Sequence, residues 1–134
     1  MRTVDEIIIH CSATEEGVSY TAKDIDRWHK AKGWDCIGYH FVIDIYGTVE
    51  AGRKVSKVGA HCSGHNQLTI GVCYIGGLRN GKPADTRTDA QKKALKNLVA
   101  TLRHCYPEIK KISGHNEYSN KACPCFKVSD EQWT

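Results

Sequence analysis

The sequence contains histidine and cysteine residues whose types and spacing could hold a metal ion. His115 and Cys123 stand eight positions apart, within the stretch Ser113–Pro124. His10 lies near the other end of the chain, directly after the apolar run Ile7–Ile9. Histidine nitrogen and cysteine sulfur are ligands that zinc prefers. Three protein ligands leave the fourth position of a tetrahedral zinc ion for water, which is the arrangement of catalytic zinc sites.

Such a site would carry out hydrolysis. A zinc ion lowers the pKa of a water that it binds to about 7, and it polarises a carbonyl group that approaches it. His10 and His115 are 105 residues apart, whereas a zinc finger uses closely spaced ligand pairs and fills all four positions. The pattern therefore points to cleavage of an amide or an ester, provided that the fold brings the distant ligands together.

The composition is that of an ordinary soluble globular domain. The chain has 134 residues, of which 40% are apolar and 25% are charged, enough for one domain with a buried core. The basic residues behind its net charge of +4 are spread along the sequence, so we expect no nucleic-acid surface. A weak attraction to an anionic polymer, such as a bacterial cell wall, would fit this charge.

Targeting features and cysteine usage suggest a protein that stays where it is made. No apolar segment reaches 18 residues, and residues 1–6 show no signal-peptide pattern, so we expect no membrane insertion and no leader. The cysteine count of seven is odd, and Cys36, Cys73 and Cys105 lie within apolar patterns. We predict mostly reduced core thiols in a cytoplasmic protein. One or two disulfides are the competing interpretation.

The apolar pattern predicts five strands and two helices. Residues 21–24 and 88–91 have the form of capping boxes, each of which marks the start of a helix. Residues 52–68 predict a long loop, and residues 79–83 predict a turn. The expected strands cover residues 5–11, 38–45, 48–51, 69–75 and 109–113, and the expected helices cover residues 22–32 and about 90–106.

This order of elements indicates an α/β fold. We expect residues 1–134 to form a single domain in which a mixed central sheet of about five strands has helices packed on it. The first strand would deliver His10 and the last would deliver His115, so both imidazoles could meet above one edge of the sheet. Trp133, near the C-terminus, is expected to dock on the body of the domain.

The sequence also resembles a known family. It is similar to the type 2 N-acetylmuramoyl-L-alanine amidases, and most of all to the small lysozyme-like amidases of phages. The matching segments keep the family's order and cover nearly the whole chain, which is far more specific than one short motif. They are Ile9–Thr14 (IHCSAT), Trp28–Lys30 (WHK), Gly33–Trp34 (GW), Gly38–Phe41 (GYHF), Gly47–Arg53 (GTVEAGR), Val58–His61 (VGAH), Ile70–Val72 (IGV) and Lys121–Pro124 (KACP).

The resemblance implies a zinc amidase that cleaves the bond between N-acetylmuramic acid and L-alanine in peptidoglycan. By position it implies one zinc ion per chain, held by His10, His115 and Cys123. Tyr39 matches a tyrosine that helps to position the attacking water, and Lys121 matches a lysine that stabilises the transition state. A cation at Lys121 would hold the developing oxyanion, and the neutral hydroxyl of Tyr39 can donate or accept a hydrogen bond.

The other histidines receive different assignments. The resemblance places His61 at a position that lines the substrate cleft, so it is a substrate-binding candidate. His40 follows Tyr39 on an expected strand, would point the opposite way, and is assigned to the core. His29 and His104 lie in the expected helices, where packing or surface roles are expected.

One departure from the family pattern concerns the thiols. Cys125 follows Cys123 by two positions, so it could compete for the metal or oxidise with Cys123. The spacing from His115 and the proline that follows both favour Cys123. Cys11, next to His10, would face away from it on an extended strand and is not expected to be a ligand.

Two other functional classes stay open from the sequence. A peptidoglycan-recognition module would bind muropeptides without cutting them, although relatives of that kind typically lack the cysteine ligand. An intracellular interaction protein could use the same scaffold to bind another macromolecule. We expect a monomer whose partner is peptidoglycan or a muropeptide, with no nucleic acid. It would reach the cell wall by lysis, through a holin-type pore or by a dedicated secretion route, and the phage branch favours a lysin.

Overall fold

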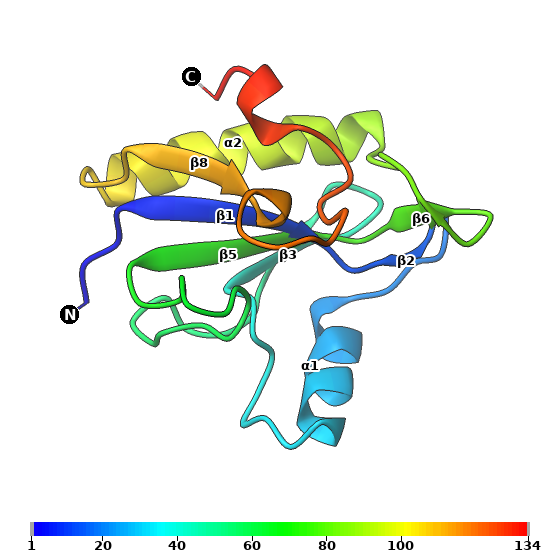
Figure 1. Cartoon of the computed structure of the whole chain (residues 1–134), viewed down its shortest axis with the longest axis horizontal. Coiled ribbons are helices and arrows are strands. Elements are labelled where there is room, and N and C mark those ends of the chain that lie inside the picture. Colours follow the sequence, from blue (N-terminus) through cyan, green and yellow to red (C-terminus); the bar gives the residue numbers. More distant parts are fainter. Residues whose placement is uncertain (1, 134) are drawn as a thin grey trace.

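A five-stranded mixed sheet forms the centre of the molecule (Figure 1). The structure is a computed structural model, and it describes residues 2–133. Four strands run parallel, and β4 at one edge pairs antiparallel with β3. This architecture confirms the predicted α/β fold. In spatial order the strands are β4 (Val49–Ala51), β3 (Phe41–Ile43), β5 (Thr69–Tyr74), β1 (Glu6–Cys11) and β8 (Lys111–Gly114).

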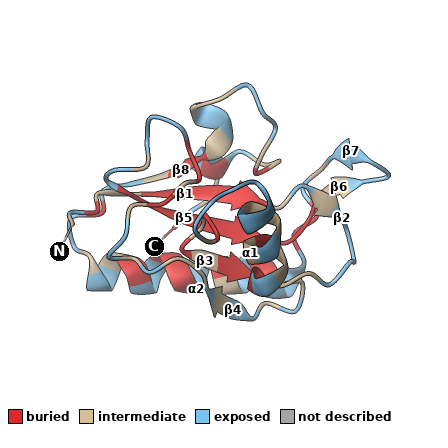
Figure 2. Cartoon of the chain, turned by 90° about the horizontal axis from the view of Figure 1, so that it is seen from below, coloured by how far each residue is buried: buried red, intermediate tan, exposed pale blue. Residues whose placement is uncertain are grey.

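Two helices cover opposite faces of this sheet (Figures 1 and 2). Successive residues of a strand point to opposite faces, so β5 serves both helices. Val72 and Tyr74 pack under α2 (Asp89–Cys105), whereas Cys73 packs beside α1 (Ala22–Ala31). Figure 2 shows the central strands as a buried layer between the helices. Burying one aliphatic side chain there stabilises the fold by roughly 1.5–3 kcal/mol.

Each helix begins at the capping box that the sequence predicts. Before α1, the backbone N–H of Thr21 donates to the carboxylate of Asp24 at 2.8 Å. At the start of α2, Thr88 and Gln91 exchange hydrogen bonds, because the backbone N–H of each donates to the side-chain oxygen of the other at 3.0 Å. These bonds satisfy backbone groups that the first turn of a helix leaves without partners.

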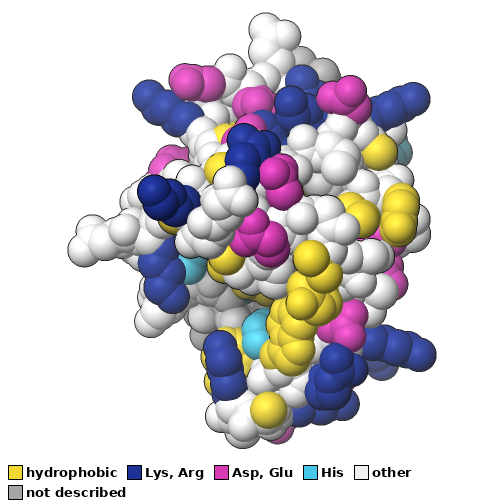
Figure 3. Space-filling model, turned by 90° about the vertical axis from the view of Figure 1, so that its right-hand side faces the viewer, with side chains coloured by type: hydrophobic (Ala, Val, Ile, Leu, Met, Phe, Trp, Pro, Cys, Tyr) yellow, Lys and Arg dark blue, Asp and Glu magenta, His cyan; other side chains and the backbone are white. Residues whose placement is uncertain are grey.

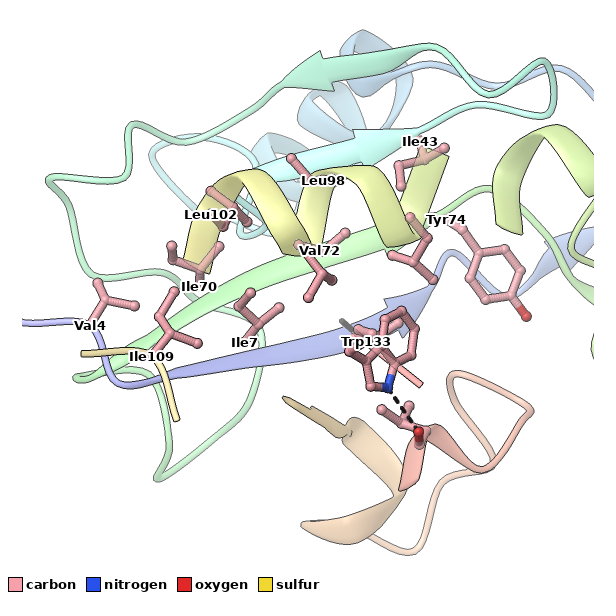
Figure 4. Close-up of a cluster of buried hydrophobic side chains, with 14 of the residues drawn as sticks. Val4, Ile7, Ile43, Ile70, Val72, Tyr74, Leu98, Leu102, Ile109 and Trp133 are labelled. Carbon is pink, nitrogen blue, oxygen red and sulfur yellow. Dashed lines mark hydrogen bonds between the residues drawn. The ribbon is translucent and has the colours of Figure 1, made fainter. Parts of the chain in front are cut away.

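The larger hydrophobic cluster lies between the sheet and α2 (Figure 4). Strand residues such as Ile7 and Val72 pack there with Leu98 of the helix. Trp133 packs against the same cluster, and its indole N–H donates to the carbonyl oxygen of Val128 at 3.0 Å. Val128 begins a short 3-10 helix, η2 (Val128–Asp130). The expected docking of Trp133 is therefore confirmed.

A second, small sheet forms around residues 79–83, where the sequence predicts only a turn. β2 (Thr14–Glu15) pairs with β6 (Gly77–Arg79), which pairs with β7 (Lys82–Pro83). Asn80 and Gly81 both have positive φ angles, 53° and 75°, as a tight hairpin turn requires. Strands of two or three residues are too short to leave a periodic pattern in the sequence.

The strand expected over residues 38–45 is shorter, because β3 begins at Phe41 and ends at Ile43. Before it, the chain pairs with the long loop: the backbone N–H of Ala60 donates to the carbonyl oxygen of Gly38 at 3.1 Å. A Cβ atom on Gly38 would lie 2.1 Å from the carbonyl oxygen of Ala60, so only glycine permits this approach.

All seven cysteines are free, in agreement with the predicted reduced thiols. Cys73 is buried as expected, but Cys36 is only half-buried and Cys105 is exposed. The assignment of Cys105 to an apolar core position is therefore wrong. The buried stripe of α2 ends at Leu102, so its last turn, with His104 and Cys105, faces solvent.

The surface carries charges of both signs. On the face that Figure 3 presents, Lys and Arg side chains alternate with Asp and Glu, unlike the basic stripe of a nucleic-acid-binding domain. Within residues 2–133, no helix is long and apolar enough to cross a lipid bilayer.

Candidate metal centre and its cleft

His10 and His115 meet at one edge of the sheet. β1 and β8 run parallel with Ile9 opposite Gly114, so the residues that follow these two come side by side. His115 opens a short 3-10 helix, η1 (His115–Glu117), and the chain then returns with Cys123. One ligand atom from each of the three residues lies within 4.8 Å of the others. The structure thus brings all three predicted metal ligands together.

His10 is the buried member of this group, with 1% of its surface exposed. Its ring centre lies 4.6 Å from that of His115 and 5.1 Å from that of Tyr39. Burial, followed by the effects of His61, His115 and Lys121, lowers the pKa of His10 well below its usual value. His10 is therefore neutral, which is the form that binds a metal.

His115 and Cys123 approach from the surface and are half-buried. Burial and the charge of Lys121 lower the pKa of His115, so it too favours the neutral form. The Sγ of Cys123 lies 3.9 Å from Nδ1 of His10 and accepts the backbone N–H of Cys11 at 3.2 Å. A metal ion binds cysteine through its sulfur in the thiolate form.

Buried polar contacts fix the segment that carries Cys123. The hydroxyl of Tyr74 donates to the carbonyl oxygen of Pro124 at 2.6 Å. The side chain of Arg87 is 2% exposed, bonds to two carboxylates, and places its guanidinium carbon 3.4 Å from the ring centre of Phe126. The loop ligand is thus anchored on both the sheet and the segment before α2.

The structure separates Cys123 from the two neighbouring thiols. Cys125 donates to the carbonyl oxygen of Gly77 at 3.4 Å, and its sulfur lies 3.9 Å from that of Cys11. Burial raises the pKa of Cys125 to about 12, and the hydrogen bond with Cys123, together with burial, raises the pKa of Cys11. Both thiols keep their protons, and of the three cysteines Cys123 is the one grouped with the two histidines.

The donor set and its spacing fit a zinc ion. Zinc binds histidine nitrogen at about 2.0–2.1 Å and cysteine sulfur at about 2.3 Å, so a tetrahedron places these atoms roughly 3.5 Å apart. The 3.9 Å between His10 Nδ1 and Cys123 Sγ is close to that separation. Three protein ligands also leave one position open, as in catalytic zinc sites.

A cleft of about 400 Å³ opens beside this group. His61, His115 and Lys121 line it, and the exposed Lys121 can reach a molecule bound there. Trp34, 37% exposed, forms another part of the wall. Sequence reasoning gives Trp34 no site role of its own, because a tryptophan in a loop carries no pattern that marks it as a cleft residue.

Tyr39 lies between the metal centre and α1. Its ring centre is 5.1 Å from that of His10 and 5.6 Å from that of His29. Burial is the main cause that raises the pKa of Tyr39 well above its usual value, so the phenol keeps its proton. It can therefore donate a hydrogen bond next to the predicted ligands.

His61 contacts the site in two ways. It lines the cleft, where the sequence resemblance places it, and its Nδ1 lies 2.9 Å from Nε2 of His10. Its own Nε2 lies 3.1 Å from the hydroxyl of Thr69. The sequence does not point to Thr69 or to the bond with His10, because these contacts join a loop to two strands and no spacing marks them.

The remaining predicted histidines lie where packing explains them. His40 is buried, its Nδ1 accepts the N–H of Gly71 at 3.0 Å, and its Nε2 donates to the carbonyl oxygen of Lys57 at 2.8 Å. Burial is the main cause that lowers the pKa of His40 to about 4. His29 is half-buried in α1, and His104 is exposed on α2. These positions agree with the core, packing and surface roles expected.

Comparison with known proteins shows what this chain is similar to. Residues 1–126 match the family described as N-acetylmuramoyl-L-alanine amidase. The endolysin of Escherichia phage T7 is 43% identical over 127 residues, which cover 94% of this chain and 83% of that protein.

More distant similarities are found to proteins of other organisms. The solved structure of the N-acetylmuramoyl-L-alanine amidase LysC from Clostridium intestinale URNW superposes with a TM-score of 0.80 at 28% identity, covering 94% of this chain and 79% of that one. The peptidoglycan-recognition protein LB of Drosophila melanogaster is 29% identical over 128 residues, covering 88% of this chain and 53% of that protein.

Proposed function

The chain belongs to the N-acetylmuramoyl-L-alanine amidase family, and we propose that it works with one zinc ion held by His10, His115 and Cys123. The enzyme cleaves the amide bond between N-acetylmuramic acid and L-alanine in peptidoglycan. The observation that carries the zinc proposal is the convergence of two neutral imidazoles and one thiol, from distant parts of the chain, beside an open cleft.

The three ligands divide the work of holding the metal. His10 and His115 offer neutral nitrogen atoms, and Cys123 offers a sulfur atom that accepts the backbone N–H of Cys11. A zinc ion bound there would polarise the amide carbonyl and supply a water-derived nucleophile at neutral pH.

Lys121 and Tyr39 would act on the reacting groups. Lys121 lines the cleft beside His115, so its ammonium group can face the carbonyl oxygen of a bound amide. It would stabilise the negative charge that develops there as the carbonyl carbon becomes tetrahedral. Tyr39 keeps its proton and lies next to His10, so its hydroxyl can hold and orient the attacking water.

The cleft walls would contact the substrate, and the relatives favour a role in cell lysis. His61 and Trp34 line the cleft, where they would contact the glycan or the stem peptide of a muropeptide. Relatives that are endolysins favour a lysin, which we propose acts as a monomer. Such a lysin would reach the wall by lysis, through a holin-type pore or by a dedicated secretion route.

Digestion of purified peptidoglycan, followed by mass spectrometry of the products, tests this function. We expect stem peptides with a free L-alanine amino terminus, loss of that product with a chelator, and its return with added zinc. If the zinc-loaded protein binds muropeptides but releases no free amino terminus, it is a recognition module, as the likeness to recognition protein LB would then suggest. Activity that survives full removal of metal would contradict the zinc site.

A further inference from the structure

The buried ligand His10 has an unusual hydrogen-bond partner. A metal-binding histidine usually passes its second ring N–H to a carboxylate, a backbone carbonyl or water. Here Nε2 of His10 lies 2.9 Å from Nδ1 of His61, a second imidazole. A carbonyl or a carboxylate can only accept, whereas a neutral imidazole nitrogen donates or accepts according to its tautomer. Some other group must therefore set the direction of this bond.

Thr69 sets that direction. Its Oγ1 lies 2.7 Å from the carbonyl oxygen of His65, 3.5 Å from that of Asn66, and 3.1 Å from Nε2 of His61. A hydroxyl has one hydrogen, and a carbonyl oxygen can only accept. The hydrogen of Thr69 thus points to the carbonyl of His65, and its oxygen accepts from His61. Nε2 of His61 carries the proton.

The proton on Nε2 of His61 determines where His10 carries its proton. A neutral His61 with its proton on Nε2 has a bare Nδ1, which accepts the Nε2–H of His10. Nδ1 of His10 is then bare as well, and this is the atom that lies 3.9 Å from Cys123 Sγ. The lone pair of His10 is directed to the place where the metal ligands converge.

Packing holds the ring of His61 in this orientation. His61 is 9% exposed, and a Cβ atom at Gly71 or Gly59 would lie 2.6 Å or 2.7 Å from its ring. The backbone N–H groups of His61 and Cys62 both donate to the side-chain oxygen of Asn66 at 3.0 Å. The two glycines therefore make room for the ring, and Asn66 fixes the turn that carries it.

We propose that Thr69 and His61 are positioning residues that fix the tautomer of His10, so that its Nδ1 is always free to bind the metal. The proposal rests on the metal site proposed above. Without the hydroxyl of Thr69, His61 is free to carry its proton on Nδ1. His10 would then accept at Nε2 and carry its proton on Nδ1, which blocks the metal.

Zinc affinity of Thr69→Val, measured by competition with a chelator, tests the effect of the hydroxyl. We expect a loss of about 10–100-fold, the usual range for a partner of a metal ligand. Thr69→Ser keeps the hydroxyl and should retain wild-type affinity. Thr101→Val, on the exposed face of α2, is the matched control. Wild-type zinc affinity in folded Thr69→Val would overturn the proposal.

Nitrogen NMR of the histidine rings in the zinc-free wild-type protein tests the same proposal without a variant. We expect the Nε2–H tautomer for both His10 and His61. An Nδ1–H tautomer at His10 would overturn the relay even if the protein is an active zinc amidase. Conversely, the expected tautomers in a protein that binds no zinc would contradict the proposed function and leave the relay intact.

Discussion

The two sides of the metal centre have opposite surroundings. The sheet half, consisting of His10, His61 and Thr69, is buried, and each side chain is hydrogen-bonded to the next. The loop half, consisting of His115, Lys121 and Cys123, is half-buried or exposed and follows the end of β8.

This difference separates two tasks. A buried and fully bonded group holds its orientation when substrate arrives, because every alternative leaves a polar atom without a partner. An exposed cation such as Lys121 has the freedom to follow charge as it develops on a substrate. The sheet half would hold one metal ligand in a fixed orientation, whereas the loop half would supply the other two ligands and the cation that acts on the substrate.

The largest effect should come from removing the sulfur of the loop half. Cys123→Ala deletes one of the three proposed ligands, so we expect complete loss of bound zinc and of amidase activity. Cys125→Ala is the matched control, because its thiol bonds to Gly77 and lies outside the ligand group. Zinc content of the purified proteins, measured by atomic absorption, distinguishes the two. If Cys123→Ala keeps zinc and Cys125→Ala loses it, the loop half is misassigned.

A smaller effect is expected from Lys121, the member of the loop half that would contact the substrate and not the metal. Lys121→Ala should keep its zinc and lose about 10²–10³-fold in kcat, the usual loss for one group that stabilises an oxyanion. Lys127→Ala, an exposed lysine in the same segment, should keep wild-type turnover. Steady-state kinetics on a soluble muropeptide gives kcat and KM separately. Loss of metal from Lys121→Ala would show that this lysine supports the site and not the transition state.

The same division explains what the sequence could predict. The three proposed ligands could be predicted because His and Cys are chemically distinctive, and because His10 directly follows the apolar run Ile7–Ile9. Both capping boxes mark their helices because capping is a local interaction. The bond from His61 to His10 crosses 51 positions, and nothing local to either residue signals it. The hairpin of β6 and β7 is missed because its strands are too short for a pattern.

The positions of two cysteines show another limit of prediction from the sequence. Cys73 and Cys105 both lie among apolar neighbours in the sequence, yet only Cys73 is buried. Cys73 sits in a central strand with a helix on its face, whereas Cys105 lies past the last buried turn of α2. Where a helix stops contacting the sheet depends on the length of the sheet, which the helix sequence does not contain.

The smallest expected effect is a loss of stability in acid, caused by His40 next to the sheet half. His40 is 1% exposed and fixes the loop that carries His61, and its pKa is lowered to about 4, mainly by burial. At pH 8, well above its unfolded pKa of about 6.5, the imidazole is neutral in the folded and the unfolded chain, so it carries no penalty. As the pH falls, the unfolded chain takes up the proton first. Stability should drop by about 2 kcal/mol at pH 5 and by about 3 kcal/mol below pH 4.

Denaturant unfolding of the zinc-free protein between pH 8 and pH 5, compared with His40→Gln, isolates this contribution. Gln cannot titrate, so the variant should lose about 2 kcal/mol less than the wild type over this range, whatever its stability at pH 8. Subtraction removes the other titrating groups, including His61, whose pKa burial also lowers, to about 3. Equal slopes in the two proteins would show that His40 takes up a proton as readily in the folded chain. In that case His10 and His61 would be held neutral by their surroundings, but His40, which bonds to the loop that carries His61, would not.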